Sequence, residues 1–313
     1  IGDSLIIKES STGATLLAVG NGYSTTGKWI FNSSTLYINF KSNPDFNTGA
    51  GFSLLFRRLY SNVAALPAVN GYMGNCFLFD VKNGIVRSGH LNNAAMGGYS
   101  SAFGYSAASS GLYSTAVGFF TNATGQASVA IGNGSEAFGP SSAAFGLNTT
   151  SVGSAAMAMG GQTIAAGDYS TALGNLTGAR GDYSTAMGRQ TTANGLHSTA
   201  MGRLTNASGE NSTAMGKYTD ATGYAATAIG DSSLASGAIS LASGFRTTAS
   251  GDFSTAMGYN AIASGDRSTA IGNYVSTNNQ GGSFIIGDNS TAVGMVSPVP
   301  NFFAARFAGG YRL

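Results

Sequence analysis

The sequence predicts an all-β protein: a solenoid of about thirteen coils of fourteen residues, preceded by a β-sandwich-like N-terminal region. Three observations predict this class. Near-identical segments recur at a fixed spacing, short stretches within them alternate in residue type with a period of two, and glycine bounds each stretch. Of 313 residues 47 are glycine and only 9% are charged. Such a composition is typical of β-structure with tight turns and closely packed small side chains.

Composition and charge exclude several other classes. Hydrophobic residues make up 43% of the chain, too many for a charge-rich disordered tail, and glycine does not recur at every third position as in collagen. A formal net charge of +2 provides no strong attraction for nucleic acid. The single cysteine, Cys76, excludes an intrachain disulfide, and no run of about 18 apolar residues is present. We therefore expect no nucleic-acid partner and no membrane contact within this sequence.

Residues 1 to 60 do not repeat, and we expect them to form the β-sandwich-like region. Runs that alternate or are apolar predict strands at DSLIIKES, TLYINF and GFSLLF. The order D-x-L-x-I, L-L-A-V-G-N-G, S-S-T-L-Y-I-N-F-K-S-N, G-F-S-L-L-F-R resembles the second half of a CUB-type β-sandwich. Calcium-binding CUB domains have aspartates at the positions of Asp3 and Asn43, so the asparagine argues against a metal site. Ile1 is expected to be the start of a processed chain or of a fragment. Either the sandwich begins before Ile1, or a different β-sheet packs on the tip of the rod.

Residues 61 to 96 are expected to connect the N-terminal region to the solenoid and to cap it. The runs CFLFD, from Cys76 to Asp80, and GIVRSG, from Gly84 to Gly89, predict a hairpin. A bare solenoid end would expose strand edges that invite aggregation, so a hairpin over the first coil protects it.

Thirteen units fill residues 97 to 278 without an insertion. Glycines recur every fourteen residues from Gly97 to Gly265, and a second series runs halfway between, from Gly104 to Gly272. A helix would lose about 1 kcal/mol at each such glycine relative to alanine, which excludes a coiled coil. The stretch S-T-A-M predicts a strand with Thr and Met on one face and Ser and Ala on the other. Two strands and two turns with positive φ at glycine make one coil, and stacking at about 4.8 Å gives a rod of roughly 60 Å.

The two faces of this strand predict different roles. An apolar residue precedes every second-series glycine except at Ser243, and we expect this column to fill the interior. Alanine stands on the other face in every unit, which indicates close approach of another chain and a parallel bundle with cyclic symmetry. The alanines predicted to pack between subunits are Ala102, Ala116, Ala130, Ala144, Ala158, Ala172, Ala186, Ala200, Ala214, Ala228, Ala242, Ala256 and Ala270.

The units resemble the head repeats of trimeric autotransporter adhesins, the YadA-like group, whose pattern is N-S-V-A-I-G-x-x-S. This sequence has Y-S-T-A-M-G-x-x-T, and the A-I-G triplet stands at 130–132, 228–230 and 270–272. The resemblance implies a homotrimeric, left-handed parallel β-roll on a cell surface that attaches to a matrix protein, a glycan or another surface ligand. Tyr in place of Asn and Thr in place of Val leave the family's own ligand contacts without support here.

One column of the repeat is predicted to contact the ligand. Two residues after the first-series glycine stand partly exposed aromatic side chains that could stack on sugars or dock on apolar patches of a matrix protein. The alternative is that these rings stack on one another at a corner and cover the joint between subunits. The column comprises Tyr99, Tyr113, Tyr169, Tyr183, His197 and Phe253.

A second column holds Arg189, Arg203 and Lys217 in consecutive units. With Asp182 and Glu210 close by in sequence, we interpret it as a solvated face.

The sequence predicts no enzyme, cofactor or metal site. His90 and His197 stand about a hundred residues apart, and neither has a cysteine or second histidine at ligand spacing. No nucleophile elbow or nucleotide-binding loop is present, the units lack the regular aspartate of calcium-binding β-roll repeats, and they supply no matched carboxylate pair.

After Gly272 the spacing fails, and residues 279 to 313 are expected to form a terminal irregular coil and an exit segment. FIIGDNSTAVG predicts the coil and PVPNFFAARFAGGYRL ends the chain. The tail resembles the exit of such heads, which continue to a stalk or to an endosialidase-type self-cleaving chaperone. We expect the attachment element beyond Leu313 or on another chain.

Three further functions compete with that of a surface adhesin. The same rod would serve as a receptor-binding fibre of a phage or contractile injection particle, or as the subunit of an extracellular filament. A threonine ladder in S-T-A-M also permits ice binding, against which stands the expectation that threonine faces the interior with methionine.

Overall fold

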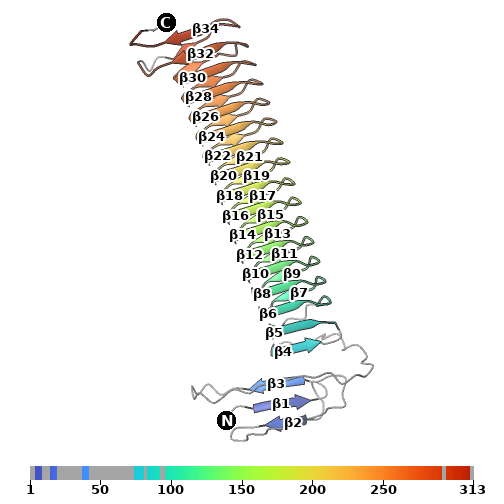
Figure 1. Ribbon diagram of the computed structural model, residues 1–313. Helices are drawn as coiled ribbons and strands as arrows, with labels where there is room; N and C mark the ends of the chain where they lie inside the picture. Colours follow the sequence, from blue (N-terminus) through green and yellow to red (C-terminus); the bar gives the residue numbers. More distant parts are fainter. Residues whose placement is uncertain are drawn as a thin grey trace.

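The computed structural model describes residues 4–8, 15–19, 37–41, 74–80, 83–91, 96–290 and 294–310. Strands and turns make up these residues, and none of them is helical. Figure 1 shows the strands after β5 stacked one above another along a narrow rod. The predicted all-β class and the parallel solenoid of stacked coils are confirmed.

Three strands of the N-terminal region form an antiparallel sheet in the order β2-β1-β3; they are β1 (Ser4–Lys8), β2 (Thr15–Val19) and β3 (Tyr37–Lys41). Strands predicted at DSLIIKES and TLYINF are therefore present, whereas GFSLLF and the positions Asp3 and Asn43 lie outside the described residues. The sandwich and the CUB-like resemblance stay predictions.

The predicted hairpin is also present. Strand β4 (Gly74–Asp80) pairs antiparallel with β5 (Ile85–Leu91), and β5 pairs in parallel with the first long strand of the repeat. The change from antiparallel to parallel pairing at β5 marks where the roll begins.

Each fourteen-residue unit contributes one long and one short strand, and each set forms its own parallel sheet. Equivalent residues pair from unit to unit, as in Thr199 with Thr213 and Ala200 with Ala214, so they form straight columns along the rod. The long strands are β6 (Ser101–Tyr105), β8 (Thr115–Phe119), β10 (Val129–Asn133), β12 (Ala143–Leu147), β14 (Met157–Gly161), β16 (Thr171–Asn175), β18 (Thr185–Arg189), β20 (Thr199–Arg203), β22 (Thr213–Lys217), β24 (Thr227–Asp231), β26 (Leu241–Phe245), β28 (Thr255–Tyr259) and β30 (Thr269–Asn273). The short strands are β7 (Ala108–Ser109), β9 (Asn122–Ala123), β11 (Glu136–Ala137), β13 (Thr150–Ser151), β15 (Ile164–Ala165), β17 (Gly178–Ala179), β19 (Thr192–Ala193), β21 (Asn206–Ala207), β23 (Asp220–Ala221), β25 (Leu234–Ala235), β27 (Thr248–Ala249), β29 (Ile262–Ala263) and β31 (Val275–Ser276).

The irregular coil expected after residue 279 continues both sheets. Strand β32 (Phe284–Gly287) pairs with β30, β33 (Met295–Val296) pairs with β31, and β34 (Phe303–Arg306) adds a strand that the sequence did not predict. The guanidinium of Arg306 holds this end together by donating to the carbonyl oxygens of Asn273 at 2.8 Å and Asp288 at 2.9 Å. Hydrogen bonds from the Ser290 hydroxyl and the Ala308 backbone N–H, with the charge of Arg306, lower the pKa of Asp288 to about 2.

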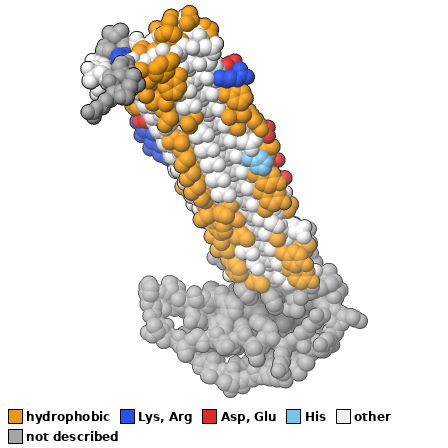
Figure 2. All heavy atoms as spheres, turned by 45° about the horizontal axis from the view of Figure 1, so that its top comes forward, with side chains coloured by type: hydrophobic (Ala, Val, Ile, Leu, Met, Phe, Trp, Pro, Cys, Tyr) orange, Lys and Arg blue, Asp and Glu red, His pale blue; other side chains and the backbone are white. Residues whose placement is uncertain are grey.

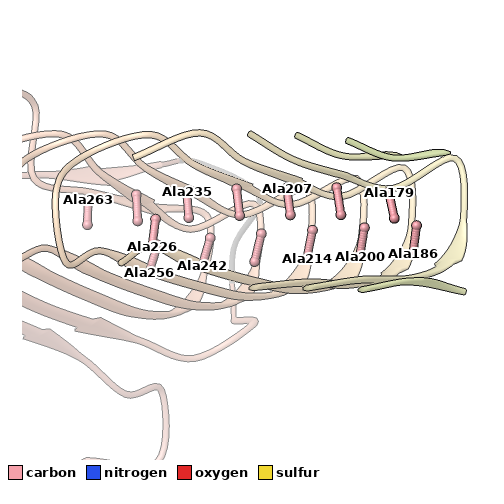
Figure 3. Close-up of a cluster of buried hydrophobic side chains, with 14 of the residues drawn as sticks. Ala179, Ala186, Ala200, Ala207, Ala214, Ala226, Ala235, Ala242, Ala256 and Ala263 are labelled. Carbon is pink, nitrogen blue, oxygen red and sulfur yellow. The ribbon is translucent and has the colours of Figure 1, made fainter. Parts of the chain in front are cut away.

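The predicted alternation along the long strand is correct, but the prediction of which face lies inside is wrong. Within a single chain Ala200 is 0% exposed, and all thirteen alanines from Ala102 to Ala270 are at most 1% exposed. Figure 2 shows the apolar side chains as a column on the outer surface, and Figure 3 shows Ala200 and Ala214 pointing across the coil toward Ala207. Two strands and two turns leave room inside only for methyl and hydroxyl groups. These alanines therefore form the core of the roll and cannot be the contact between subunits.

Glycine is required in the two series for different physical reasons. The second series has φ between +117° and +134°, which side-chain-bearing residues rarely adopt, as at Gly202. The first series lacks positive φ, contrary to expectation; a Cβ at Gly195 would instead overlap the carbonyl oxygen of Gly209 in the next coil. Positive φ at the corners falls mostly on other residues, including Tyr183 at 57° and the β-branched Ile239 at 54°.

Buried threonines suggest a stabilising substitution. The hydroxyl of Thr191 is fully buried and has no hydrogen-bond partner in the described structure. Such a group costs about 1–3 kcal/mol when it leaves water unpaired. We expect Thr191→Val to raise the free energy of unfolding by about 1 kcal/mol, measured by denaturant titration. The neighbouring Thr192→Val, on the outer face, should change it by less than about 0.5 kcal/mol. Loss of stability in Thr191→Val would contradict the prediction.

Candidate binding surfaces of the rod

An apolar stripe runs along the outer face of the long-strand sheet (Figure 2). Its side chains are at least partly exposed, up to 40% at Met159 and Ile229. An exposed apolar surface that extends along a whole rod marks a site that another molecule covers. The stripe consists of Phe103, Val117, Ile131, Phe145, Met159, Leu173, Met187, Met201, Met215, Ile229, Met257 and Ile271.

The threonines of S-T-A-M lie on this same outer face. Thr185, Thr199 and Thr213 are half-buried beside the stripe and do not point into the roll. The prediction that these threonines face the interior of the roll is therefore wrong. The argument against ice binding, which rested on that prediction, no longer applies. The column is interrupted by larger apolar side chains at Met157 and Leu241, which makes it an irregular hydroxyl array.

The predicted aromatic column lies at the corner before each long strand. Its backbone continues the stacking, since the N–H of Tyr183 donates to the carbonyl oxygen of Asp168 at 2.8 Å. The tyrosines of the column are more than half exposed, with 57% at Tyr169 and 53% at Tyr183, and His197 is exposed as well. Tyr169 stacks on Tyr183 at 5.1 Å between ring centroids, and Tyr183 stacks on His197 at 4.9 Å.

The structure divides this column into three parts. Tyr99 and Tyr113 form a separate stack at 5.3 Å, because three coils without a ring at this corner follow them. Phe253 lies apart, with the guanidinium of Arg267 5.8 Å from its ring centroid. The largest continuous aromatic surface among the predicted residues is therefore the trio Tyr169, Tyr183 and His197.

Carboxylates beside the aromatic column form hydrogen bonds between adjacent coils, a role that the sequence did not predict. The Oδ1 atom of Asp168 accepts from the backbone N–H of Ser154 at 2.7 Å, and that of Asp182 accepts from the N–H of Asp168 at 2.9 Å. Asp252 and Asp266 bond in the same way to the coils before them. Figure 2 shows acidic side chains along this edge. The recurring G-D pair was the available sequence signal.

The basic column occupies the opposite edge of the long-strand sheet. Arg189, Arg203 and Lys217 are the last residues of β18, β20 and β22 and pair in register. Asp182 and Glu210, close by in sequence, precede the starts of β18 and β22 and so lie away from the column. The three basic residues are exposed, as expected of a solvated face.

One acidic residue does lie on the basic edge. The Nζ atom of Lys217 lies 3.2 Å from Oδ2 of Asp231. The hydroxyl of Ser232 and then Lys217 lower the pKa of Asp231.

Aromatic side chains on the basic edge were not singled out from the sequence. Tyr105 stacks between His90 at 4.6 Å and Phe119 at 5.0 Å, and Phe120 meets Phe119 edge-on at 4.5 Å. Phe119 and Phe120 are 45% and 53% exposed. The rod thus carries aromatic groups along both of its edges.

No group of three or more metal-ligating side chains occurs in the part of the chain that the structure describes. Within the same residues there is no helix of the length and hydrophobicity needed to cross a membrane.

Stacked coils whose equivalent side chains form straight exposed columns define a solenoid repeat protein that presents extended surfaces. The family model of the YadA head domain repeat (2 copies) matches residues 95–121, 123–149, 151–177, 179–205, 193–219, 221–247 and 249–274. The chain belongs to the family of YadA head repeats. Comparison with curated proteins found no significant match.

Proposed function

We propose that this chain is the head of a homotrimeric adhesin on a cell surface, attaching its bearer to a surface, a matrix or another cell. Membership in the YadA head repeat family is the observation that carries the proposal. A receptor-binding fibre or a filament subunit would use the same rod, and neither has a specific structural feature in its favour. Catalysis forms no part of this function.

The apolar stripe is the surface through which we propose that three chains assemble. Parallel rods related by cyclic symmetry place one equivalent face of each chain at the common axis. Burying the stripe at this axis would stabilise the trimer, because it removes apolar area from water at each coil. It replaces the alanine column as the predicted subunit contact.

Charging the stripe should separate the subunits. In Met187→Glu/Met201→Glu/Met215→Glu the carboxylates would lose hydration at the axis and repel their equivalents, so the mass in native buffer should fall from trimer to monomer. The matched variant Met187→Leu/Met201→Leu/Met215→Leu should keep the trimer. A glutamate variant that remains trimeric would show that the stripe is not the interface.

We propose that ligands contact the exposed aromatic trio Tyr169, Tyr183 and His197. Stacked rings with centroids 5.1 Å and 4.9 Å apart offer a continuous apolar surface to a sugar or to an apolar patch of a matrix protein. Three equivalent surfaces around a trimer, and many trimers on one cell, would convert weak contacts into strong attachment.

Removing the trio should abolish attachment without affecting assembly. Tyr169→Ala/Tyr183→Ala/His197→Ala should reduce adhesion to a panel of immobilised matrix proteins and glycans at least tenfold, with the trimer mass unchanged. The control is Tyr105→Ala/Phe119→Ala/Phe120→Ala, which removes rings from the other edge. Unchanged adhesion together with a destabilised trimer would assign the trio to the subunit joint instead.

A further inference from the structure

The basic column is explained neither by assembly through the apolar stripe nor by adhesion through the aromatic trio. Arg189, Arg203 and Lys217 pair directly across adjacent parallel strands. Like charges directly opposite one another destabilise a sheet, and these three lie only about 4.8 Å apart from coil to coil. A chain with 9% charged residues thus places three cations where they repel most.

Neutralisation within the chain is incomplete at this edge. Asp231 pairs with Lys217 at one end of the column, and Arg246, in the next coil, also lies close enough to lower the pKa of Asp231. The Arg189 side chain is exposed and forms no hydrogen bond or ion pair among the described residues. Arg203 lies 5.9 Å from the centroid of the Tyr218 ring. Four cations, those of Arg189, Arg203, Lys217 and Arg246, therefore face the single carboxylate of Asp231 at the ends of the long strands. Asp220 lies on the neighbouring short strand β23.

The acidic edge gives a useful contrast. Asp168, Asp182, Asp252 and Asp266 each accept a backbone N–H from the preceding coil, so their charge has a role in the fold. Arg189 and Arg203 have no equivalent role. Two exposed guanidinium groups, those of Arg189 and Arg203, that form no ion pair among the described residues point to an external partner of opposite charge.

We propose that this basic edge binds an acidic polysaccharide that lies along the rod. From Arg189 to Lys217 the column covers about 10 Å at the spacing of parallel strands, comparable to the length of a disaccharide. Guanidinium groups match the geometry of carboxylate and sulfate oxygens and bind them bidentately. Tyr218, which is 45% exposed between the cations, offers its ring to a sugar face.

This site is separate from the aromatic trio and depends on the proposed function only in that the edge must stay open in the assembled trimer. Its ligand differs as well, because the trio lies beside carboxylates that repel acidic glycans. The two surfaces would therefore respond differently to added salt, because salt screens charges and weakens binding mainly at the basic edge.

The test uses the full chain and two probes: a size-defined heparin oligosaccharide, which is sulfated, and a hyaluronan oligosaccharide, which carries only carboxylates. Calorimetry at several salt concentrations should show that both bind and that affinity falls as salt rises. Arg189→Gln/Arg203→Gln should weaken binding at least tenfold. The control Arg180→Gln/Arg267→Gln removes the same charge elsewhere on the rod and should change affinity less than twofold. Tyr218→Ala should weaken oligosaccharide binding severalfold.

Three results would overturn the proposal. Equal losses in the two double variants, or no loss in either, would show that only net charge matters or that the edge does not bind. Tighter binding of inorganic polyphosphate than of either oligosaccharide would identify a general anion surface. A fall in native mass of Arg189→Gln/Arg203→Gln would show that a neighbouring subunit covers the edge. The triple variant of the aromatic trio should keep heparin binding, so failure here and failure of the adhesion proposal are distinguishable.

Discussion

Ala200→Leu is expected to disrupt the roll, lowering the free energy of unfolding by roughly 3 kcal/mol or more. Ala200 is 0% exposed and faces the short strand across the coil, as its neighbours do in Figure 3. A leucine there has no space, because the coils above and below hold equally buried alanines at the same position. Denaturant unfolding at fixed protein concentration measures the effect.

The matched control is Thr199→Leu, one residue earlier on the same strand. Its side chain lies on the outer face, and Leu241 already occupies the equivalent position in another coil. We expect a change of less than about 1 kcal/mol. The reverse order of effects, with Thr199→Leu the more damaging, would show that the inside and outside of the roll have been exchanged.

Gly202→Ala should be comparably damaging, with a loss of roughly 3 kcal/mol or more. Its φ of +122° is strained for any residue with a side chain, and the added Cβ would overlap the carbonyl oxygen of Gly216 in the next coil. That atom belongs to the backbone of a paired strand and cannot move without breaking the stack. Thermal unfolding should show a much lower transition temperature than in the wild type.

Arg203→Ala is the control for this substitution. It changes the adjacent residue, whose side chain is exposed, and should leave the transition within a degree or two of the wild type. If Gly202→Ala unfolds at the wild-type temperature, the close approach of coils at this glycine is not a constraint on the fold.

The period of the sequence predicted the strands correctly but could not assign their faces. Alternation in S-T-A-M places Ala200 and Met201 on opposite sides, yet either side satisfies the pattern. The usual rule that larger apolar residues lie inside led to the wrong choice. The decisive quantity is the space within a coil, which follows from how closely the two sheets approach. The small residues Ser198, Thr205 and Ala207, which share that space with Ala200, were the signal.

The geometry of the surfaces proposed for binding was predicted only in part. Periodicity placed Tyr169, Tyr183 and His197 in one column, and the structure brings them together as a continuous stack. Periodicity did not predict that the Asp182 carboxylate would accept a hydrogen bond from the preceding coil. That contact occurs beside a corner at which Tyr183 has a left-handed backbone conformation. Many different residue types adopt positive φ at these corners, so no single residue type in the sequence indicates them.

Assembly of three chains through the apolar stripe is tested most directly by the mass of the intact wild-type protein in native buffer. The expected value is about three times the 31.5 kDa of one chain, and it should persist on dilution. A stable particle of 31.5 kDa, with its methionine and isoleucine column open to water, would contradict the assembly and the adhesin head built on it.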